Sequence, residues 1–143
     1  MCAVVIDYRL DRVVDKLGRE VLVYVPIIDL VLHANHKYSP GLACYLDTGA
    51  HYNVFPEEVA LASFGMSQKS ISKGLELPIL GVGGCSATAY GFDVEIIHPY
   101  FKFMSKISFL KNQPFPLLGR VGFMDHFDKI TLNEKDKKLE LVI

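Results

Sequence analysis

Runs of apolar and β-branched residues, separated by turn residues, dominate the chain and predict a mainly β fold. The longest run covers Arg19 to Leu32 and reads Arg-Glu-Val-Leu-Val-Tyr-Val-Pro-Ile-Ile-Asp-Leu-Val-Leu. Because Pro26 excludes a helix interior, we expect one long, bent strand here. Proline has no amide hydrogen, so this strand should lie at a sheet edge or carry a bulge at Pro26.

Further strands are predicted wherever apolar residues recur between glycines, prolines and other turn residues. Asn35, Ser39, Pro40 and Gly41 give the segment His33–Gly41 the composition of a turn. The last two predicted strands form a carboxy-terminal hairpin. The predicted strands cover Leu42–Leu46, His51–Phe55, Leu75–Leu80, Cys85–Ile97, Tyr100–Leu110, Phe127–Asn133 and Lys138–Ile143.

Two short helices are predicted beside these strands. The first runs from Pro56 to Phe64, with proline at the first helical position and two glutamates that favour the positive end of the helix dipole. Gly65 should end it. The second covers Arg120 to Asp125.

Composition narrows the possible functions. The 143 residues are 50% hydrophobic and 22% charged, which predicts one compact domain over residues 1–143. A formal net charge of −1 provides no positive field for nucleic acid. The longest apolar stretch, Val21–Leu32, is broken by Pro26 and Asp29, so we expect no membrane span. The amino terminus shows no basic leader, which predicts a cytoplasmic protein.

The cysteines and histidines predict neither a disulfide framework nor a metal site. Cys2, Cys44 and Cys85 are few, scattered and odd in number, which favours reduced structural thiols that are buried as small hydrophobic side chains. His33 and His36 lie in or beside a polar loop without paired metal-ligand spacing, so they are interpreted as a solvated face. No metal and no cofactor is expected.

Candidate chemistry begins at Asp47-Thr48-Gly49, which follows the apolar strand Leu42–Leu46. The carboxylate leaves the sheet directly into a turn, where backbone amides can reach it. Taken alone, this tripeptide also fits an aspartate that satisfies its own turn. The run Gly81-Val82-Gly83-Gly84 lies between two predicted strands, can adopt positive φ angles and predicts a mobile hairpin.

Three motifs, in this order and spacing, resemble those of the retropepsins, the single-domain aspartic proteases of retroviruses and their cellular and prokaryotic relatives. Leu46–Ala50 looks like the catalytic loop, and Leu117-Leu118-Gly119-Arg120 looks like the hydrophobic-hydrophobic-Gly-Arg signature before the short helix. Gly81–Gly84, followed by residues 89–96, looks like the flap. The resemblance implies a closed, barrel-like acid protease lobe with one or two short helices and a flap hairpin, and we expect a prokaryotic member.

The resemblance also implies roles for the loop residues. Asp47 would hold the attacking water, Thr48 would lock two such loops together, and Gly49 beside Ala50 would let substrate backbone approach. The chain has one Asp-Thr-Gly, so the second carboxyl must come from another copy in a twofold homodimer. The flap would close over an extended peptide. Val82 and Leu118 are candidate pocket walls, which predicts apolar side chains beside the cleaved bond.

Two departures from the retropepsin pattern stand out. His51 occupies the position where viral members often carry an acid that can pair with the later arginine, so the partner of Arg120 is open. The segments Met1–Gly18 and His33–Gly41 are longer than compact viral enzymes need.

Two interpretations remain open. The strand Leu139–Ile143 alternates in polarity; it is either an unpaired edge that joins a sheet shared between subunits, or an ordinary internal strand. The competing function is a retropepsin-like module that dimerises or binds peptides with weak or no catalysis. Replacing Asp47 by Asn separates the two functions, since a binding module keeps its peptide affinity.

Overall fold

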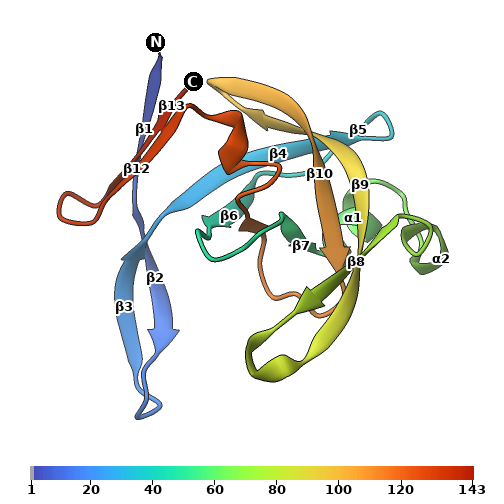
Figure 1. Ribbon diagram of the computed structural model, residues 1–143, viewed down its shortest axis with the longest axis horizontal. Coiled ribbons are helices and arrows are strands. Elements are labelled where there is room, and N and C mark those ends of the chain that lie inside the picture. The colour runs from blue at the N-terminus through green and yellow to red at the C-terminus, as the bar shows by residue number, and fades with distance from the viewer. Residues whose placement is uncertain (1) are drawn as a thin grey trace.

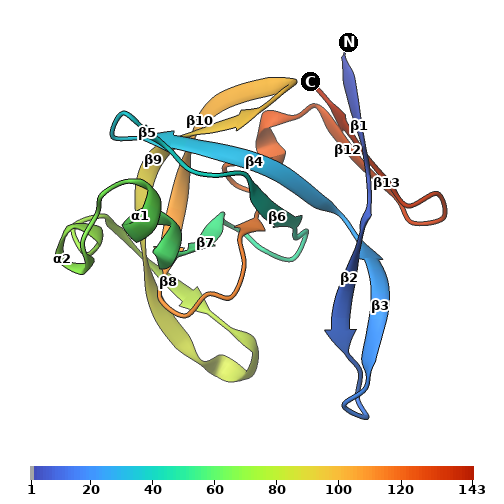
Figure 2. The same ribbon diagram turned by 180° about the vertical axis from the view of Figure 1, so that it is seen from behind.

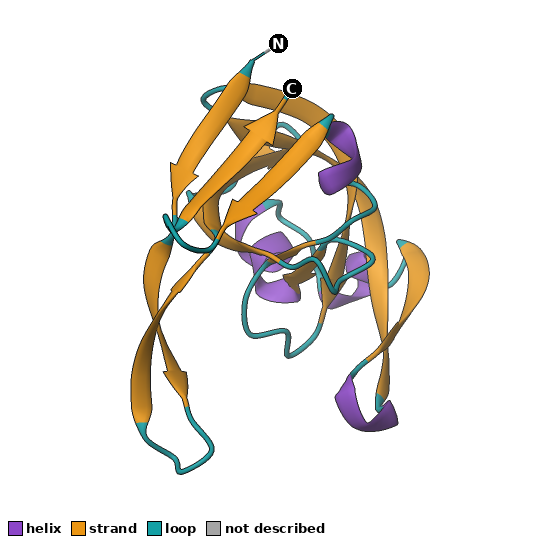
Figure 3. Cartoon of the chain, turned by 60° about the vertical axis from the view of Figure 1, so that its left-hand side comes forward, coloured by secondary structure: helices purple, strands orange, loops and turns teal. Residues whose placement is uncertain are grey.

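The computed structural model describes residues 2–143, apart from the side chain of Val82, and consists mainly of β-strands (Figures 1 and 3). The strands are β1 (Ala3–Asp7), β2 (Arg9–Val14), β3 (Glu20–Val25), β4 (Ile27–Ala34), β5 (Lys37–Tyr38), β6 (Leu42–Leu46), β7 (Val54–Pro56), β8 (Leu75–Leu80), β9 (Ser86–His98), β10 (Phe101–Leu110), β11 (Leu117–Leu118), β12 (Lys129–Asn133) and β13 (Lys138–Val142). The helices are α1 (Glu57–Ser63) and α2 (Gln68–Ile71), with short 3₁₀ turns at Val82–Gly84 and Met124–His126.

A closed barrel forms the centre of the structure. Its strands follow the order β4-β6-β11-β7-β10-β9, and β9 pairs again with β4. The closing register places Val31 opposite Ile97 and His33 opposite Glu95. Figure 2 shows α1 and α2 together on one side of the barrel. The predicted fold class, a mainly β, barrel-like sheet with short helices and a hairpin, is confirmed.

The core of the barrel consists of side chains that point inward from alternate positions along the strands. On β4, every second side chain points inward, so that Ile28, Leu30 and Leu32 are at most 1% exposed. On β10, Ile107 and Phe109 also point inward and are at most 1% exposed. Because β6 and β11 both belong to this barrel, the core fixes the starting points of the two loops that follow them.

Pro26 divides the predicted long strand into two. β3 pairs only with β2, whereas β4 begins after Pro26 and joins the barrel, so the prediction of one bent strand over Arg19–Leu32 is wrong. The proline cannot donate a ladder hydrogen bond, which permits the chain to change sheets there. The result is a separate two-stranded ribbon, residues 9–25, that projects from the barrel (Figures 1 and 3). We call it the β2–β3 arm.

The carboxy-terminal strand lies inside a three-stranded sheet of order β1-β13-β12. β13 pairs with β1 on one side and with β12 on the other, and the predicted carboxy-terminal hairpin is confirmed. Leu139–Val142 therefore forms a central strand, and the interpretation of this segment as an unpaired edge is wrong. The chain ends meet here, since the Ile143 N–H donates to the Cys2 carbonyl at 2.8 Å.

Local chemistry explains how the helices differ from expectation. α1 forms as predicted, except that Pro56 caps it rather than occupying its first turn. The helix predicted over Arg120–Asp125 shrinks to Met124–His126, because Gly122 adopts a φ of 96° that no helix accepts. α2 was not predicted; Ser67 and Ser70 form a capping box at its start. Among residues 2–143, no helix is long and apolar enough to cross a membrane.

Candidate active site

The Asp47 loop begins where β6 leaves the barrel. The Asp47 N–H donates to the Leu118 carbonyl at 3.0 Å, and the Ala50 N–H donates to the Asp47 carbonyl at 3.1 Å. The carboxylate is half-buried, and its Oδ1 accepts a hydrogen bond from the Gly49 N–H at 2.9 Å. Backbone bonds on both sides therefore fix this carboxylate at the end of a buried strand.

A second loop, residues 117–122, lies beside the first and completes its hydrogen bonds. β11 pairs in parallel with β6, with Leu118 opposite Leu46. The Arg120 N–H donates to the Ala50 carbonyl at 3.0 Å, and the Val121 N–H donates to the His51 carbonyl at 2.8 Å. The structure thus brings together Asp47–Ala50 and Leu117–Arg120, two of the three motifs found in the sequence.

Gly119 and Asn53 lock the two loops together. A Cβ added to Gly119 would lie 2.4 Å from the Tyr52 carbonyl oxygen, so only glycine allows this approach. The Asn53 side chain is 1% exposed; its Oδ1 accepts from the Gly119 N–H at 2.9 Å and its Nδ2 donates to the Lys106 carbonyl at 3.2 Å. Sequence reasoning missed Asn53, because its role depends on segments distant in the chain.

The third motif faces the carboxylate across a cavity of about 510 Å³. β8 and β9 form the predicted hairpin, with Leu80 opposite Ser86 and residues 81–85 at its tip. The cavity is lined by Asp47, Gly49, Ala50, His51, Tyr52, Val54, Pro78, Ile79, Leu80, Gly81, Gln113 and Leu117. Asp47 is the one carboxylate in this lining. The hairpin therefore forms the roof of a largely apolar cavity with a carboxylate in its floor.

Not every predicted site residue reaches this cavity. Thr48 instead lines a neighbouring pocket with Arg120, and Gly83 and Gly84 lie at the hairpin tip outside the lining. Leu118 is fully buried in the core, so its prediction as a pocket wall is wrong; Leu117, the adjacent residue on β11, lines the cavity instead. The side chain of Val82 lies outside the described residues.

The sequence left the ion-pair partner of Arg120 open. Among the described side chains, its guanidinium has no ion-pair partner, and His51, at the position of the viral acid, is exposed. Arg120 contributes to the site through its backbone, as shown above.

Residues beyond the motifs also line the cavity, among them Tyr52, Gln113 and Pro78–Leu80. Tyr52 is exposed and also lines a second, apolar cavity of about 320 Å³. The only sequence signal for it was its place soon after Asp47-Thr48-Gly49-Ala50. Gln113 comes from the loop after β10, and nothing in the sequence places that loop at the site.

The cysteines, and the histidines other than His51, lie outside the lining of the cavity. Cys44 is buried as predicted, and burial, followed by the charge of Asp29, raises its thiol pKa. Cys2 and Cys85 are exposed, contrary to the expectation of buried thiols. His33 is only partly buried, and its Nδ1 lies 3.2 Å from Glu95 Oε1. Within residues 2–143, no group of three or more metal-ligating side chains is close enough to hold a metal ion.

This architecture is similar to that of a known protease. The chain aligns with the crystal structure of a retropepsin-like aspartic protease from Rickettsia conorii at a TM-score of 0.64 and 15% identity, covering 98% of this chain and 89% of that chain. A second similar structure is EIAV protease complexed with the inhibitor HBY-793, at a TM-score of 0.44 and 20% identity, covering 76% and 88% respectively. No protein-family model and no curated protein sequence matches the chain. The chain therefore has the retropepsin-like fold, as the sequence motifs predicted.

Proposed function

We propose that the protein is an aspartic endopeptidase that acts as a twofold homodimer. The observation that carries this proposal is the Asp47 carboxylate, held at the end of β6 in the floor of a cavity that the β8–β9 hairpin covers. The retropepsin-like fold supports the same assignment. Peptide hydrolysis by this route needs a general base and a general acid, and two carboxyl groups that share one proton supply both.

The second carboxyl group would come from another copy of the chain. Asp47 is the one carboxylate among the residues described in the cavity lining. A twofold axis beside the Asp47 loop would bring two such groups together, with a water molecule held between them. One Asp47 would accept a proton from the water as it attacks the peptide carbonyl, and the other would donate a proton to the departing amine.

The remaining residues of the site would bind the peptide. We propose that an extended substrate lies between the Asp47 loop and the hairpin, and that the hairpin pairs with its backbone as an added strand does. Ile79, Leu80 and Leu117 provide apolar walls. Apolar side chains beside the cleaved bond would therefore bind best, and charged ones would lose solvation without a partner.

The testing experiment is cleavage of a proteome-derived peptide library between about pH 4 and pH 7, the range in which a carboxyl pair holds one proton. Asp47→Asn preserves the shape of the side chain but cannot act as the base, so cleavage should disappear. Asp93→Asn is the matched control, since Asp93 is an exposed carboxylate on β9 outside the cavity. Activity should also rise faster than linearly with protein concentration, because only the dimer is active.

The competing function, a peptide-binding or dimerisation module, predicts a different result. Such a module would bind peptides equally well with Asp47 or Asn at this position and would show no Asp47-dependent cleavage.

We further propose that residues 1–143 act as one domain, half of the enzyme, in the cytoplasm.

A further inference from the structure

The β2–β3 arm has two chemically different faces. Its register places Leu10 opposite Tyr24, Arg12 opposite Leu22 and Val14 opposite Glu20, so these side chains share one face. All are exposed, and the apolar members range from 46% to 69% exposed. We call this the outer face; it consists of Leu10, Arg12, Val14, Glu20, Leu22 and Tyr24. The opposite face is partly buried along β3.

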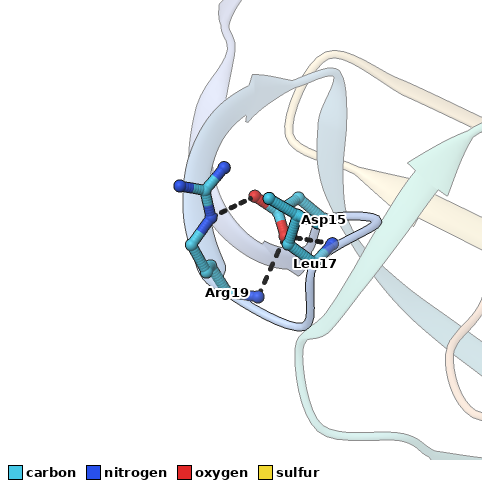
Figure 4. Close-up of polar contacts among 3 residues, drawn as sticks. All are labelled: Asp15, Leu17 and Arg19. Atoms are coloured by element: carbon cyan, nitrogen blue, oxygen red, sulfur yellow. Dashed lines mark hydrogen bonds and ion pairs between the residues drawn. The ribbon is translucent and has the colours of Figure 1, made fainter.

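The arm is a preformed ribbon with a structured tip. Figure 4 shows Asp15 there: its Oδ1 accepts from the Arg19 and Leu17 N–H groups, each at 2.9 Å, and its Oδ2 accepts from Arg19 Nε at 3.0 Å. These bonds, that from the Arg19 backbone foremost, hold the pKa of Asp15 below its ordinary value. An isolated two-stranded ribbon is only marginally stable in water. An exposed apolar face on such a ribbon therefore indicates a surface that another molecule covers.

The arm starts beside the Asp47 loop. The Leu46 N–H donates to the Pro26 carbonyl at 3.0 Å, at the carboxy-terminal root of the arm. Tyr45, also on β6, donates its hydroxyl to the Asp11 carboxylate, which raises the pKa of Tyr45 to about 12. Any second copy that brings its Asp47 next to this one must therefore lie close to the root of the arm, since Asp47 directly follows Leu46.

A second pocket borders the Asp47 loop. It has a volume of about 450 Å³ and borders Thr48. Met124, Phe127, Ile130 and Leu132 give it apolar walls, and Arg120 and Lys129 add two positive charges against the negative charge of Asp128. Arg120 has no ion-pair partner among the described residues. The outer face of the arm offers apolar side chains and two exposed charges, Arg12 and Glu20, whose Nη1 and Oε2 atoms lie 3.9 Å apart. Of these charges, the Glu20 carboxylate complements the net positive charge of the pocket.

We propose that the outer face of each arm docks into the Thr48–Arg120 pocket of a second copy of the chain. In a twofold dimer, a contact between element i of one copy and element j of the other occurs twice, so each copy provides one arm and receives one. Because the root of the arm and the pocket both adjoin the Asp47 loop, this exchange would hold the two Asp47 loops together. The proposal rests on the proposed function for the position of the twofold axis.

The charge of the arm favours a second copy over other partners. Residues 9–25 contain Arg9, Arg12, Lys16 and Arg19 against Asp11, Asp15 and Glu20, or four positive charges against three negative ones. Such a balance does not attract nucleic acid or an anionic membrane. An arm with this charge balance can bind a second copy of the chain, whose net charge is −1, without strong repulsion.

Sedimentation velocity of the full chain over a range of concentrations tests the proposal. Leu22→Asp places a charge in the outer face and should raise the dimer dissociation constant about 100-fold. Leu75→Asp is the matched control: Leu75 is 63% exposed on β8, Leu22 is 60% exposed, and Leu75 lies outside both arm and pocket. It should leave the constant within about twofold of the parent. A parent that stays monomeric, or a Leu22→Asp variant that dimerises like the parent, would overturn the proposal, as would Leu22-dependent binding of phosphatidylglycerol vesicles by a monomer.

A charge exchange provides a second, independent test. Arg120→Glu should weaken the dimer, and adding Glu20→Arg should restore it; failure of the double variant to recover would overturn the proposal. Folding of each variant is checked by circular dichroism. The measurements are repeated in an Asp47→Asn background, since dimerisation requires no catalysis. Asp47-dependent cleavage that substitutions in the arm leave unchanged would refute this inference but not the proposed function. Dimers that depend on the arm but cleave no peptide would refute the proposed protease.

Discussion

The floor and the roof of the candidate active site use glycine in opposite ways. In the floor, a Cβ on Gly119 would lie 2.4 Å from the Tyr52 carbonyl, and one on Gly122 would lie 2.7 Å from Ser105 Oγ. In the roof, a Cβ on Gly83 or Gly84 would meet no heavy atom within 4 Å. Glycine allows close packing in the floor, where Gly122 also has a φ of 96°, whereas in the roof its role is limited to positive φ angles of 84° and 80°.

This difference assigns a separate task to each wall. The floor joins two loops by backbone hydrogen bonds and by the buried amide of Asn53, which holds the Asp47 carboxylate in a fixed place. The roof is a two-stranded hairpin with open space around Gly83 and Gly84 at its tip. A fixed carboxylate and an adjustable cover are what the proposed peptide hydrolysis would require.

The largest effect is expected from Gly119→Ala. The added methyl group would overlap Tyr52 backbone atoms, which cannot move without breaking the bonds between the loops. The variant should lose about 3 kcal/mol or more of unfolding free energy, or fail to fold. Urea unfolding followed by circular dichroism measures this. A variant as stable as the parent would show that the floor is not tightly packed.

A slightly smaller effect is expected from Asn53→Ala. The substitution removes the acceptor of the Gly119 N–H and the donor to the Lys106 carbonyl, and both groups lie in a buried region. Leaving them unpaired should cost about 2–4 kcal/mol of unfolding free energy. The same urea titration measures this loss, and a change below about 0.5 kcal/mol would contradict the role given to Asn53.

Gly83→Ala probes the roof and should be much milder. The methyl group meets open space, so the cost is the strain of a positive φ in a residue with a Cβ, about 1 kcal/mol. If the roof covers the substrate, this variant should change the KM for a cleaved peptide. The free-energy change that corresponds to this change in KM should exceed the loss of unfolding free energy. An effect on stability as large as that of Gly119→Ala would remove the contrast between the two walls.

The smallest effect concerns His98, at the opposite end of β9 from the tip. Burial lowers its pKa, and its ring stacks on Phe101 with centroids 4.6 Å apart. The unfolded chain, with a pKa of about 6.5, then binds more protons than the folded chain below that pH. Stability should therefore fall as the pH drops from about 6.5 to the lowered folded value. Urea unfolding at a series of pH values should show a shallower decline for His98→Gln, and an unchanged decline would contradict this.

Short-range patterns made the local parts of the site predictable. Leu46–Ala50 and Gly81–Gly84 each lie within one turn, where residue type sets the backbone, and both were found in the sequence. The parts that depend on distant pairing were not predictable. Whether Leu117 or Leu118 faces the cavity depends on the parallel register of β11 with β6. Pro26 separates two sheets because the residues before it pair with β2, whereas the residues after it pair with β6.

The most direct test of the account is a mixing experiment between parent and Asp47→Asn chains. At constant total protein, above the dimer dissociation constant, the two are exchanged and the cleavage of a peptide substrate is measured. If each site needs one Asp47 from each copy, activity follows the square of the parent fraction and falls to about a quarter in an equal mixture. Activity that falls only in proportion to the parent fraction, to about a half, would contradict the shared site.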